Sequence, residues 1–425
     1  METYIIILLL VIIALAGAPL FTIIAAIGLL LFNAAGTDTA AMIAELYRLV
    51  DLPALIAIPL FTFAGYLLAE SQAPKRLINL AQALFGWMPG GLAVVALFST
   101  AVFTAFSGAS GVTIIALGGL IYPALVKQNY PEQFALGLMT TSGSLGLLFP
   151  PSLPIILYSI IASVNIDKLF VAGLIPGVLL LMILSLYSIW TGVKSNVPRT
   201  RFEWKVVSSA LKEAAWEAPL PVVVIGGIYG GFITATEAAA LTAFYVLVVE
   251  VFIQRDVKFF GDLPRVIRES LILVGAILVM LGAAMGVTSY MIQEQIPMKM
   301  FEFISLYVSS KLVFLIILNV FILIMNMVEI FSAIVIVVPI IVPVAMQYGV
   351  DPIHLGIIFL LNLEIGYMTP PLGLNLFLSS LRFGRPLTKV YRSIVPFFIL
   401  LLIVLLLITY FPSLSTALTG AVGLG

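Results

Sequence analysis

The sequence predicts an all-α polytopic membrane protein made of two inverted-topology repeats, each with a re-entrant hairpin and a helix broken at a Pro-Pro pair. Three observations carry this prediction. Hydrophobic residues make up 62% of the 425 residues and charged residues only 9%, whereas soluble domains are about one-quarter charged. Apolar runs of membrane-spanning length recur from about residue 5 to residue 411. Two proline pairs, Pro150-Pro151 and Pro370-Pro371, interrupt such runs.

Each proline pair removes two backbone donors and disfavours the α conformation at the residue before each proline. The helix must therefore break in the middle of a hydrophobic stretch. Irregular backbone at membrane depth is tolerated only where protein buries it or where it lines a cavity. Paired broken helices in corresponding halves of a chain are typical of the central site of a secondary transporter.

Composition excludes several other classes. The net charge of zero gives no indication of nucleic-acid binding, and the lack of cysteine excludes disulfides, thiolate metal sites and cysteine nucleophiles. The first apolar run is too long for a signal peptide and has no basic residues before it. We therefore expect it to be a retained spanning helix.

Four groups of Lys and Arg orient the chain, because short loops rich in these residues stay in the cytoplasm. The groups are Lys75 and Arg76; Lys194, Arg199, Arg201, Lys205 and Lys212; Arg255, Lys258, Arg265 and Arg268; and Arg382, Arg385, Lys389 and Arg392. The first half is expected to contain an outward span at 5–32, a return at 53–70, a hairpin at 90–126, an outward broken span at 131–163 and a return at 169–191. An amphipathic cytoplasmic surface helix at 198–216 and a pair of spans at 219–233 and 238–253 follow. The rest comprises an outward span at 270–292, a second hairpin at 312–346 entered from outside, an inward broken span at 352–381 and a last span at 395–411.

An internal repeat is visible when the sequence is shifted by about 220 residues. Pro123 then falls on Pro343, Gly146 on Gly366, and the first proline pair on the second. Because the charge pattern ends the first unit outside and the second inside, the repeats have inverted topology, which suits alternating access. The expected division is 1–89 scaffold, 90–166 first repeat core, 167–311 scaffold and surface helices, 312–382 second repeat core, and 383–425 C-terminal helix.

The hairpin tips and helix breaks are where ion chemistry is expected. C-terminal helix ends suit cations and N-terminal ends suit anions. Na⁺ is a hard cation that prefers oxygen, and the polar candidates are Ser107, Ser110 and Thr113 at the first tip, Thr141, Ser142 and Ser144 before the first break, and Thr369, Asn362 and Glu364 around the second. One oxygen-rich Na⁺ site per repeat is predicted. The alternative is that these small polar residues only pack helices together.

Acidic residues inside apolar sequence are costly and usually functional. Glu329 lies at the second predicted tip, in residues 326–329. Two roles are compatible with this position: a part in the site, or capping of the helix that follows. For Glu364 we favour packing or a salt bridge over a site role. Glu237, near Thr234, is expected to cap its helix, and His354, the single histidine, is expected to be structural.

One motif suggests a different class. Residues 108–111 (Gly-Ala-Ser-Gly) match the G-x-S-G string of rhomboid-type intramembrane serine proteases. A serine nucleophile needs a base within hydrogen-bond reach. Because the single histidine, His354, belongs to the other repeat, we do not expect an enzyme.

Four segments resemble motifs of one transporter family: 106–111 (Phe-Ser-Gly-Ala-Ser-Gly), 146–152 (Gly-Leu-Leu-Phe-Pro-Pro-Ser), 351–359 (Asp-Pro-Ile-His-Leu-Gly-Ile-Ile-Phe) and 366–376 (Gly-Tyr-Met-Thr-Pro-Pro-Leu-Gly-Leu-Asn-Leu). That family is the large membrane (M) subunit of tripartite ATP-independent periplasmic (TRAP) transporters, and the resemblance extends over essentially the whole chain. It implies an elevator-type, Na⁺-coupled importer of carboxylate solutes in the bacterial inner membrane. It also implies a small four-helix membrane subunit, expected as a separate chain, and a periplasmic solute-binding protein.

The resemblance also assigns residues to two Na⁺ sites. The first site corresponds to Ser107, Ser110, Gly146, Phe149 and Pro150. The second corresponds to Gly366, Thr369 and Leu372, with Met325 standing where the family has glycine. Candidates for contact with the solute are Thr113, Asn326, Glu329 and Asn375. The runner-up function is a stand-alone Na⁺/dicarboxylate symporter of similar inverted-repeat fold that needs no binding protein.

Overall fold

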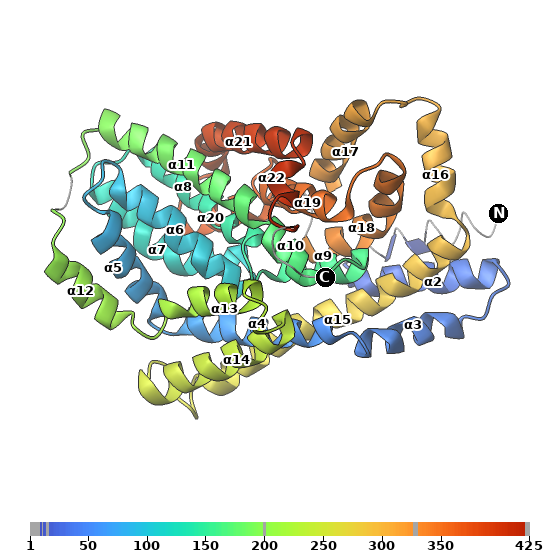
Figure 1. Cartoon of the computed structure of the whole chain (residues 1–425), viewed down its shortest axis with the longest axis horizontal. Coiled ribbons are helices and arrows are strands. Elements are labelled where there is room, and N and C mark those ends of the chain that lie inside the picture. Colours follow the sequence, from blue (N-terminus) through green and yellow to red (C-terminus); the bar gives the residue numbers. More distant parts are fainter. Residues whose placement is uncertain (1–8, 11, 14–16, 199–200, 326–329, 421–425) are drawn as a thin grey trace.

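The computed structural model describes residues 9–10, 12–13, 17–198, 201–325 and 330–420, in which helices and no strands occur (Figure 1). Within this part of the chain, seven helices are long and apolar enough to cross a membrane, or eight if the one bent helix pair counts as a single span. The predicted all-α membrane fold is confirmed.

The helices fall into groups. One side of the molecule is formed by α2 (Leu20–Ala34), α3 (Ala40–Val50), α4 (Pro53–Glu70), α13 (Pro219–Tyr229), α14 (Ala235–Leu247), its π-helical continuation η2 (Val248–Ile253) and α15 (Leu263–Gln293). The first repeat contains α6 (Gly91–Ser107), α7 (Ser110–Lys127), α8 (Glu132–Ser142), the 3₁₀ turn η1 (Leu145–Leu148) and α9 (Leu153–Ala162). The second contains α17 (Lys311–Met325), α18 (Ile330–Gln347), α19 (Pro352–Gly366) and α20 (Leu374–Phe383). The remaining helices are α5 (Ala73–Phe85), α10 (Ile166–Ala172), α11 (Leu174–Lys194), α12 (Trp204–Glu213), α16 (Ile296–Ser305), α21 (Leu387–Tyr410) and α22 (Ser413–Thr416).

We call α2–α4, α14 and α15 the scaffold helices and the helices of the two repeats the core helices; this grouping is narrower than the predicted scaffold segments 1–89 and 167–311. Figure 1 shows α15 running along one edge beside α3 and α4, with both hairpins on the same side of that edge. Core helices α6 and α19 are buried along almost their whole length. Helices α14 and α15 expose large apolar side chains, such as Phe244 and Ile272, as lipid-facing helices do. The hairpin helix α17 does so too, at Leu312 and Ile324. The first broken helix is buried at its proline pair, whereas the second is exposed there.

In each repeat, the second helix of the hairpin packs on the helix that follows the break in the other repeat. In the second repeat α18 packs on α9 of the first, and in the first repeat α7 packs on α20 of the second. The helices α7 and α18 also begin and end about 220 residues apart. A reciprocal arrangement of this kind is what an internal two-fold relation between repeats produces.

The broken helices run antiparallel to each other. The Tyr158 hydroxyl, in the second half of α9, donates to the Pro352 carbonyl at the start of α19 at 2.8 Å. Glu132, at the start of α8, forms ion pairs of 2.6 Å with Arg385 and with Lys389, just after α20. The start of each broken helix therefore lies beside the end of the other, in agreement with inverted topology.

Other long-range contacts join segments that the charge pattern assigns to the same side of the membrane. Arg265 pairs with Glu70 at 2.6 Å, both predicted to be cytoplasmic. The Thr236 hydroxyl donates to the Pro53 carbonyl at 3.1 Å, and Lys311 donates to the Gly349 carbonyl at 2.6 Å, all predicted to be outside. The two ends of the fold thus match the two predicted sides.

The place of Arg76 in a basic group suggested an unpaired charge in a loop, but Arg76 is paired. Its guanidinium contacts Glu217 at 2.6 Å, Asp256 at 2.8 Å and Glu250 at 3.2 Å, and it is largely buried. Burial lowers the pKa of Arg76, but the three carboxylates outweigh burial and raise it. This cluster joins α5 to the start of α13 and to η2.

Some elements differ from the prediction. The first apolar run is not one helix, because Gly17 has a left-handed φ of +89° and α2 begins after Pro19. Residues 1–8, 11 and 14–16 lie outside the described part. Helices α3, α5 and α16 were not expected, since polar residues interrupt their apolar pattern. In the predicted surface helix, α12 buries Val207 and Ala210 and leaves Trp204 75% exposed; Arg199 lies outside the described residues.

Cysteine labelling tests the orientation, because the native chain has no cysteine. Lys299→Cys on α16 is expected to react with a membrane-impermeant maleimide from the periplasmic side. Lys212→Cys on α12 is expected to react only after the membrane is permeabilised. Both positions are exposed, so a failure to label reflects sidedness and not burial. Labelling of both variants from the same side would contradict the inverted arrangement.

Candidate functional site

The first hairpin tip is a short non-helical turn between two helix ends. Helix α6 ends at Ser107, and Gly108 follows in the left-handed conformation with φ of +65°. The Gly108 amide donates to the Thr104 carbonyl at 2.8 Å, the usual glycine termination of a helix. Ala109 is extended, and α7 begins at Ser110. The tip therefore presents carbonyls from one helix and amides from the next.

The first helix break lies against this tip. Helix α8 ends at Ser142, η1 follows, and the Pro150-Pro151 bond is cis before α9 begins. The axis bends by 45° between the two helical parts. Gly146 in η1 packs so closely on α6 that a Cβ there would overlap the Ala101 carbonyl oxygen and the Ala105 nitrogen. Glycine is required at this position by the close approach of two backbones.

Hydroxyl groups connect the tip and the break. The Thr104 hydroxyl donates to the Gly143 carbonyl at 2.9 Å and lies 2.7 Å from the Thr113 hydroxyl. Thr113 also lies 3.4 Å from the Ala109 carbonyl. Thr104 was not among the predicted residues. Its position one turn before Ser107 on α6 is the signal that could have identified it.

Ser107 is the one candidate at the first tip whose hydroxyl has no partner among the described residues. The residue is 1% exposed, and its Oγ makes no hydrogen bond. Leaving a buried hydroxyl unpaired costs about 1–3 kcal/mol in proteins. A cation coordinated by this oxygen would remove that cost. The Ser107 hydroxyl is therefore free to act as a ligand, as are those of Ser142 and Ser152 at the first break.

The remaining residues of the first predicted site differ in what they can offer. The Phe149 ring packs on Gly177 of α11, so only its carbonyl is available at the break. Pro150 is buried at the break itself. Ser110 is 2% exposed, and its hydroxyl donates to Asn375 Oδ1 at 2.9 Å. The structure thus places Ser110 next to Gly143 at the break and Gly146 against α6 just before the tip, while Ser107 lies against Gly65 of α4.

The donor set suits Na⁺. The groups that converge are neutral hydroxyls and carbonyls, and the described residues contain no group of three or more His, Asp or Glu side chains placed to hold a metal. Ca²⁺ sites are typically rich in carboxylates, and Zn²⁺ sites use His, Cys and carboxylates. Neutral oxygens at the end of a helix, where carbonyls carry partial negative charge, suit a monovalent hard cation.

The second break has the same construction. Helix α19 ends at Gly366, the Thr369 hydroxyl donates to the Ile365 carbonyl at 2.8 Å, and the Pro370-Pro371 bond is cis. Leu372 has no side-chain oxygen, so only its carbonyl could serve an ion, and the residue is 56% exposed. Met325, the last residue of α17, packs on the core, and α17 packs on α19. Asn326 and Glu329 lie outside the described residues.

Two polar side chains on α19 have different surroundings. The Asn362 amide donates to Asn319 Oδ1 at 2.6 Å, and Asn319 in turn donates to Thr409 of α21 at 3.2 Å, which is a packing role. Glu364 is fully buried, and neither of its carboxyl oxygens has a partner among the described residues. The salt bridge considered for Glu364 is therefore not formed with any of them.

Two other predictions are confirmed, and the protease alternative is not supported. Thr234 and Glu237 form a reciprocal capping box at the start of α14. His354 is structural, since its ring nitrogens contact Ser415 Oγ at 2.6 Å and the Thr409 carbonyl at 3.4 Å. Ser110 is bonded to Asn375 and not to a base, so it is not an activated nucleophile.

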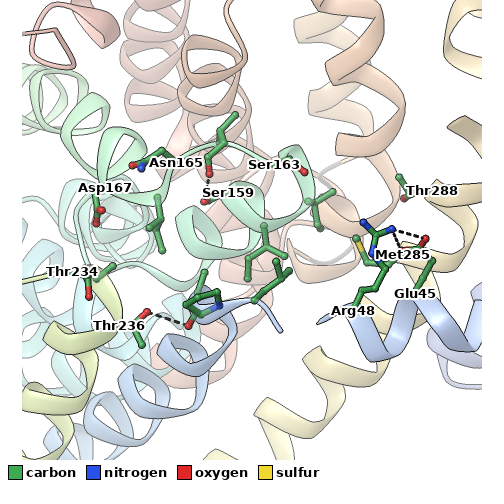
Figure 2. Close-up of a pocket in the computed structure, with 18 of the residues that line it drawn as sticks. Glu45, Arg48, Ser159, Ser163, Asn165, Asp167, Thr234, Thr236, Met285 and Thr288 are labelled. Carbon is green, nitrogen blue, oxygen red and sulfur yellow. Dashed lines mark hydrogen bonds and ion pairs between the residues drawn. The ribbon is translucent and has the colours of Figure 1, made fainter. Parts of the chain in front are cut away.

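A cleft of about 770 Å³ opens between scaffold and core at the end of α4 that the charge pattern places outside. Figure 2 shows Glu45 and Arg48 on one side of it, and Asn165, Asp167, Thr234 and Thr236 on the other. Glu45 and Arg48 form an ion pair at 3.0 Å. The cleft contains none of the predicted site residues.

The first tip instead contacts α4 near its other end. Gly65 packs on the Phe106 carbonyl and lies so close to Ser107 that an added Cβ would be 2.5 Å from the Ser107 Cα. Gly65 is twelve residues from Pro53, which corresponds to about 18 Å along a helix. The tip therefore lies toward the predicted cytoplasmic end of the scaffold, and the open cleft lies toward the opposite end.

Comparison with known proteins shows one family. The family described as the tripartite ATP-independent periplasmic transporter, DctM component, matches residues 4–414. A C4-dicarboxylate TRAP transporter large permease protein, DctM, from Pseudomonas aeruginosa is 35% identical over 401 residues, which cover 94% of this chain and 93% of that protein. An isethionate TRAP transporter permease protein, DctMQ, from Oleidesulfovibrio alaskensis is 35% identical over 413 residues, which cover 96% of this chain and 63% of that protein.

A solved structure has a related fold. The YdaH transporter from Alcanivorax borkumensis superposes with a TM-score of 0.61 over 88% of this chain and 87% of that chain, at 14% sequence identity. At this identity the likeness concerns the fold alone. It agrees with the helical membrane architecture of this chain.

Gly146→Ala tests the contact between tip and break. The added methyl group would overlap backbone atoms of α6 that cannot rotate away, so we expect a loss of about 1–3 kcal/mol in stability and a lower melting temperature in detergent. Gly275→Ala on α15 is the matched control, because an added Cβ there meets no atom within 4 Å. That control should be neutral or stabilise the protein by up to about 1 kcal/mol. Equal effects of the two substitutions would argue against the close packing of η1 on α6.

Proposed function

This chain belongs to the DctM family of tripartite ATP-independent periplasmic transporter components, and on that premise we propose that it imports an organic carboxylate by coupling its movement to Na⁺. The family is a transporter family and not an enzyme family. Its tripartite organisation includes a small membrane subunit and a periplasmic binding protein. We propose that both act with this chain, the binding protein delivering the solute at the inner membrane of a bacterium.

One observation carries the proposal of Na⁺ coupling. Ser107 places a buried hydroxyl without a partner among the described residues at the end of α6, at the first tip. The neighbouring oxygens are neutral. Release of a monovalent cation therefore leaves no carboxylate charge without a counterion. Ser110, Gly146, Phe149 and Pro150 complete the proposed first site.

The second proposed site uses Gly366, Thr369, Leu372 and the Met325 carbonyl. Its support is the repeat itself, since Gly366 and the second proline pair occupy the positions of Gly146 and the first pair. Thr113, Asn326, Glu329 and Asn375 are proposed to face the solute or to order the groups that do. Two bound Na⁺ ions would offset the charge of an anionic solute at membrane depth.

The carboxylate class is a proposal from relatives. Large permeases named for C4-dicarboxylates and for isethionate share about a third of their residues with this chain. Both names denote small organic anions; the C4-dicarboxylates are carboxylates, whereas isethionate is a sulfonate, so the carboxylate class rests on the first. A binding protein would select the particular solute, and the membrane core would supply the ion coupling.

An elevator movement is the mechanism that we propose. The core would slide as one body along the scaffold, carrying both ion sites across the membrane. Its support is the mutual packing of the two repeats, together with the position of the first tip beside Gly65 and the open cleft at the other end of α4. In this arrangement the core lies toward the predicted cytoplasmic side.

Uptake into proteoliposomes tests the function. The chain, the small membrane subunit and the binding protein are reconstituted, and labelled dicarboxylate uptake is measured with inward Na⁺ gradients. A tenfold gradient supplies about 1.4 kcal/mol per ion, so uptake is expected to require Na⁺. With two Na⁺ per divalent anion no net charge moves, and an imposed potential should have little effect. A monovalent solute should respond, since each charge is worth about 2.3 kcal/mol per 100 mV.

Controls for this experiment omit one component at a time. Equal uptake without the binding protein and the small subunit would indicate the stand-alone symporter instead. Uptake at full rate in Na⁺-free buffer under a pH gradient would reject sodium coupling.

Ser107→Ala tests the first ion site. Removing an unpaired hydroxyl trims little volume and breaks no hydrogen bond, so folding is expected to survive. The half-saturating Na⁺ concentration for uptake is expected to rise about tenfold or more, because a ligand oxygen is lost. Ser99→Ala is the matched control, since Ser99 is also buried on α6 and unpaired among the described residues, two turns before the tip. An unchanged Na⁺ dependence in Ser107→Ala would assign this serine to packing.

A further inference from the structure

Asn375 joins the two repeats through its side chain. It lies in the first turn of α20, in the second repeat, and is fully buried. Its Oδ1 accepts from the Ser110 hydroxyl of the first tip at 2.9 Å. Its amide nitrogen donates to the Thr140 carbonyl at 3.2 Å and lies 3.4 Å from Ser144 Oγ, both next to the first break. One side chain thus contacts both parts of the first proposed ion site.

The backbone of Asn375 belongs to the second proposed ion site. Its amide donates to the Tyr367 carbonyl at 3.1 Å, which closes the loop that contains Thr369 and Leu372. Gly373 in the same loop packs on backbone atoms of Tyr367 and Thr369. The position of Asn375 is therefore set by the second break, while its side chain is committed to the first site.

The direction of the Ser110 hydrogen bond has a chemical consequence. A serine hydroxyl has one proton and two acceptor lone pairs. When Ser110 donates its proton to Asn375 Oδ1, its oxygen lone pairs are left free for a cation. The opposite rotation would point the proton into the ion site and weaken binding. The bonds from the Asn375 amide to Thr140 and Ser144 hold its oxygen in the accepting position.

We propose that Asn375 is a positioning residue that couples the two ion sites. It orients the Ser110 oxygen for Na⁺ at the first site, and the geometry of the second break determines where Asn375 lies. An ion that orders the second break would fix Asn375 and so favour binding at the first site. Because coupling between sites is reciprocal, the first ion would favour the second equally. This inference rests on the proposed Na⁺-coupled function. It differs from a direct solute contact, because both polar groups of the Asn375 amide already have protein partners.

Asn375→Ala in the complete reconstituted transporter tests this coupling. Uptake is measured against Na⁺ concentration in the unsubstituted protein and in the variant. The unsubstituted protein is expected to show a Hill coefficient between 1 and 2. In Asn375→Ala we expect a value near 1 and a half-saturating Na⁺ concentration at least about fivefold higher, which is the lower range of typical coupling. The maximal rate at saturating Na⁺ should fall much less.

Ser379→Ala is the matched control. Ser379 lies one turn further along α20 and is equally buried, and its hydroxyl has no hydrogen-bond partner among the described residues. This variant should keep the cooperativity of the unsubstituted protein. If Asn375→Ala does not accumulate, Asn375→Ser replaces it. Na⁺-dependent thermal stabilisation of the detergent-purified protein then gives the Hill coefficient without transport, and a value near 1 is again expected.

Several results would overturn the coupling. The first is that Asn375→Ala keeps its cooperativity and only its maximal rate falls. The second is that Ser379→Ala loses cooperativity equally. The third is a Hill coefficient of 1 in the unsubstituted protein while its uptake still requires Na⁺. A different result separates the proposed function from this inference. Uptake by the unsubstituted protein that is independent of Na⁺ would reject sodium coupling itself, and the inference with it.

Discussion

The fold depends on satisfying the backbone groups that two proline pairs leave without helical partners at membrane depth. Lipid offers no hydrogen bonds, so each break has to be enclosed by protein or to line a cavity. The half-helix after each break packs on the hairpin of the other repeat, α9 on α18 and α20 on α7. This packing buries Pro150 and Pro151 at the first break and leaves Pro370, Pro371 and Leu372 exposed at the second.

Close backbone approach follows from this packing. Gly146 lets η1 lie directly on α6, and Gly373 lets the second loop fold back on Tyr367. Such contacts bring carbonyls and small hydroxyls together while excluding bulky side chains. The same packing therefore produces oxygen-lined sites of low charge, which suit a transported monovalent cation better than a permanently bound metal.

The scaffold has a different physical task. Its helices α14 and α15 present apolar side chains outward and pack on α2–α4, and most of its ionic contacts lie at the two ends of the fold. Arg76 and its three carboxylates join α5, α13 and η2 at one end, and Glu45 with Arg48 borders the cleft at the other. The Arg76 cluster thus fastens α5 to α13 and η2, whereas the Glu45–Arg48 pair lies within α3. In the core, Glu132 at the start of α8 pairs with Arg385 and Lys389 after α20.

The sequence by itself indicated most of the spans, the helices of both hairpins, both breaks and the inverted repeat, because hydrophobic run length, proline chemistry and loop charge are local properties. It also indicated Ser107, Ser110 and Gly146 as neighbours of one site. It did not show that the first apolar run is interrupted at Gly17. It missed α3, α5 and α16, whose polar residues find partners or surface positions only in the folded chain. Only the tertiary structure decided that Asn375 bonds to Ser110, 265 residues earlier, and that Ser107 alone among the described candidates at the first tip keeps an unpaired hydroxyl. Hydrogen-bond partners of side chains depend on which helices pack together, and no local pattern encodes that choice.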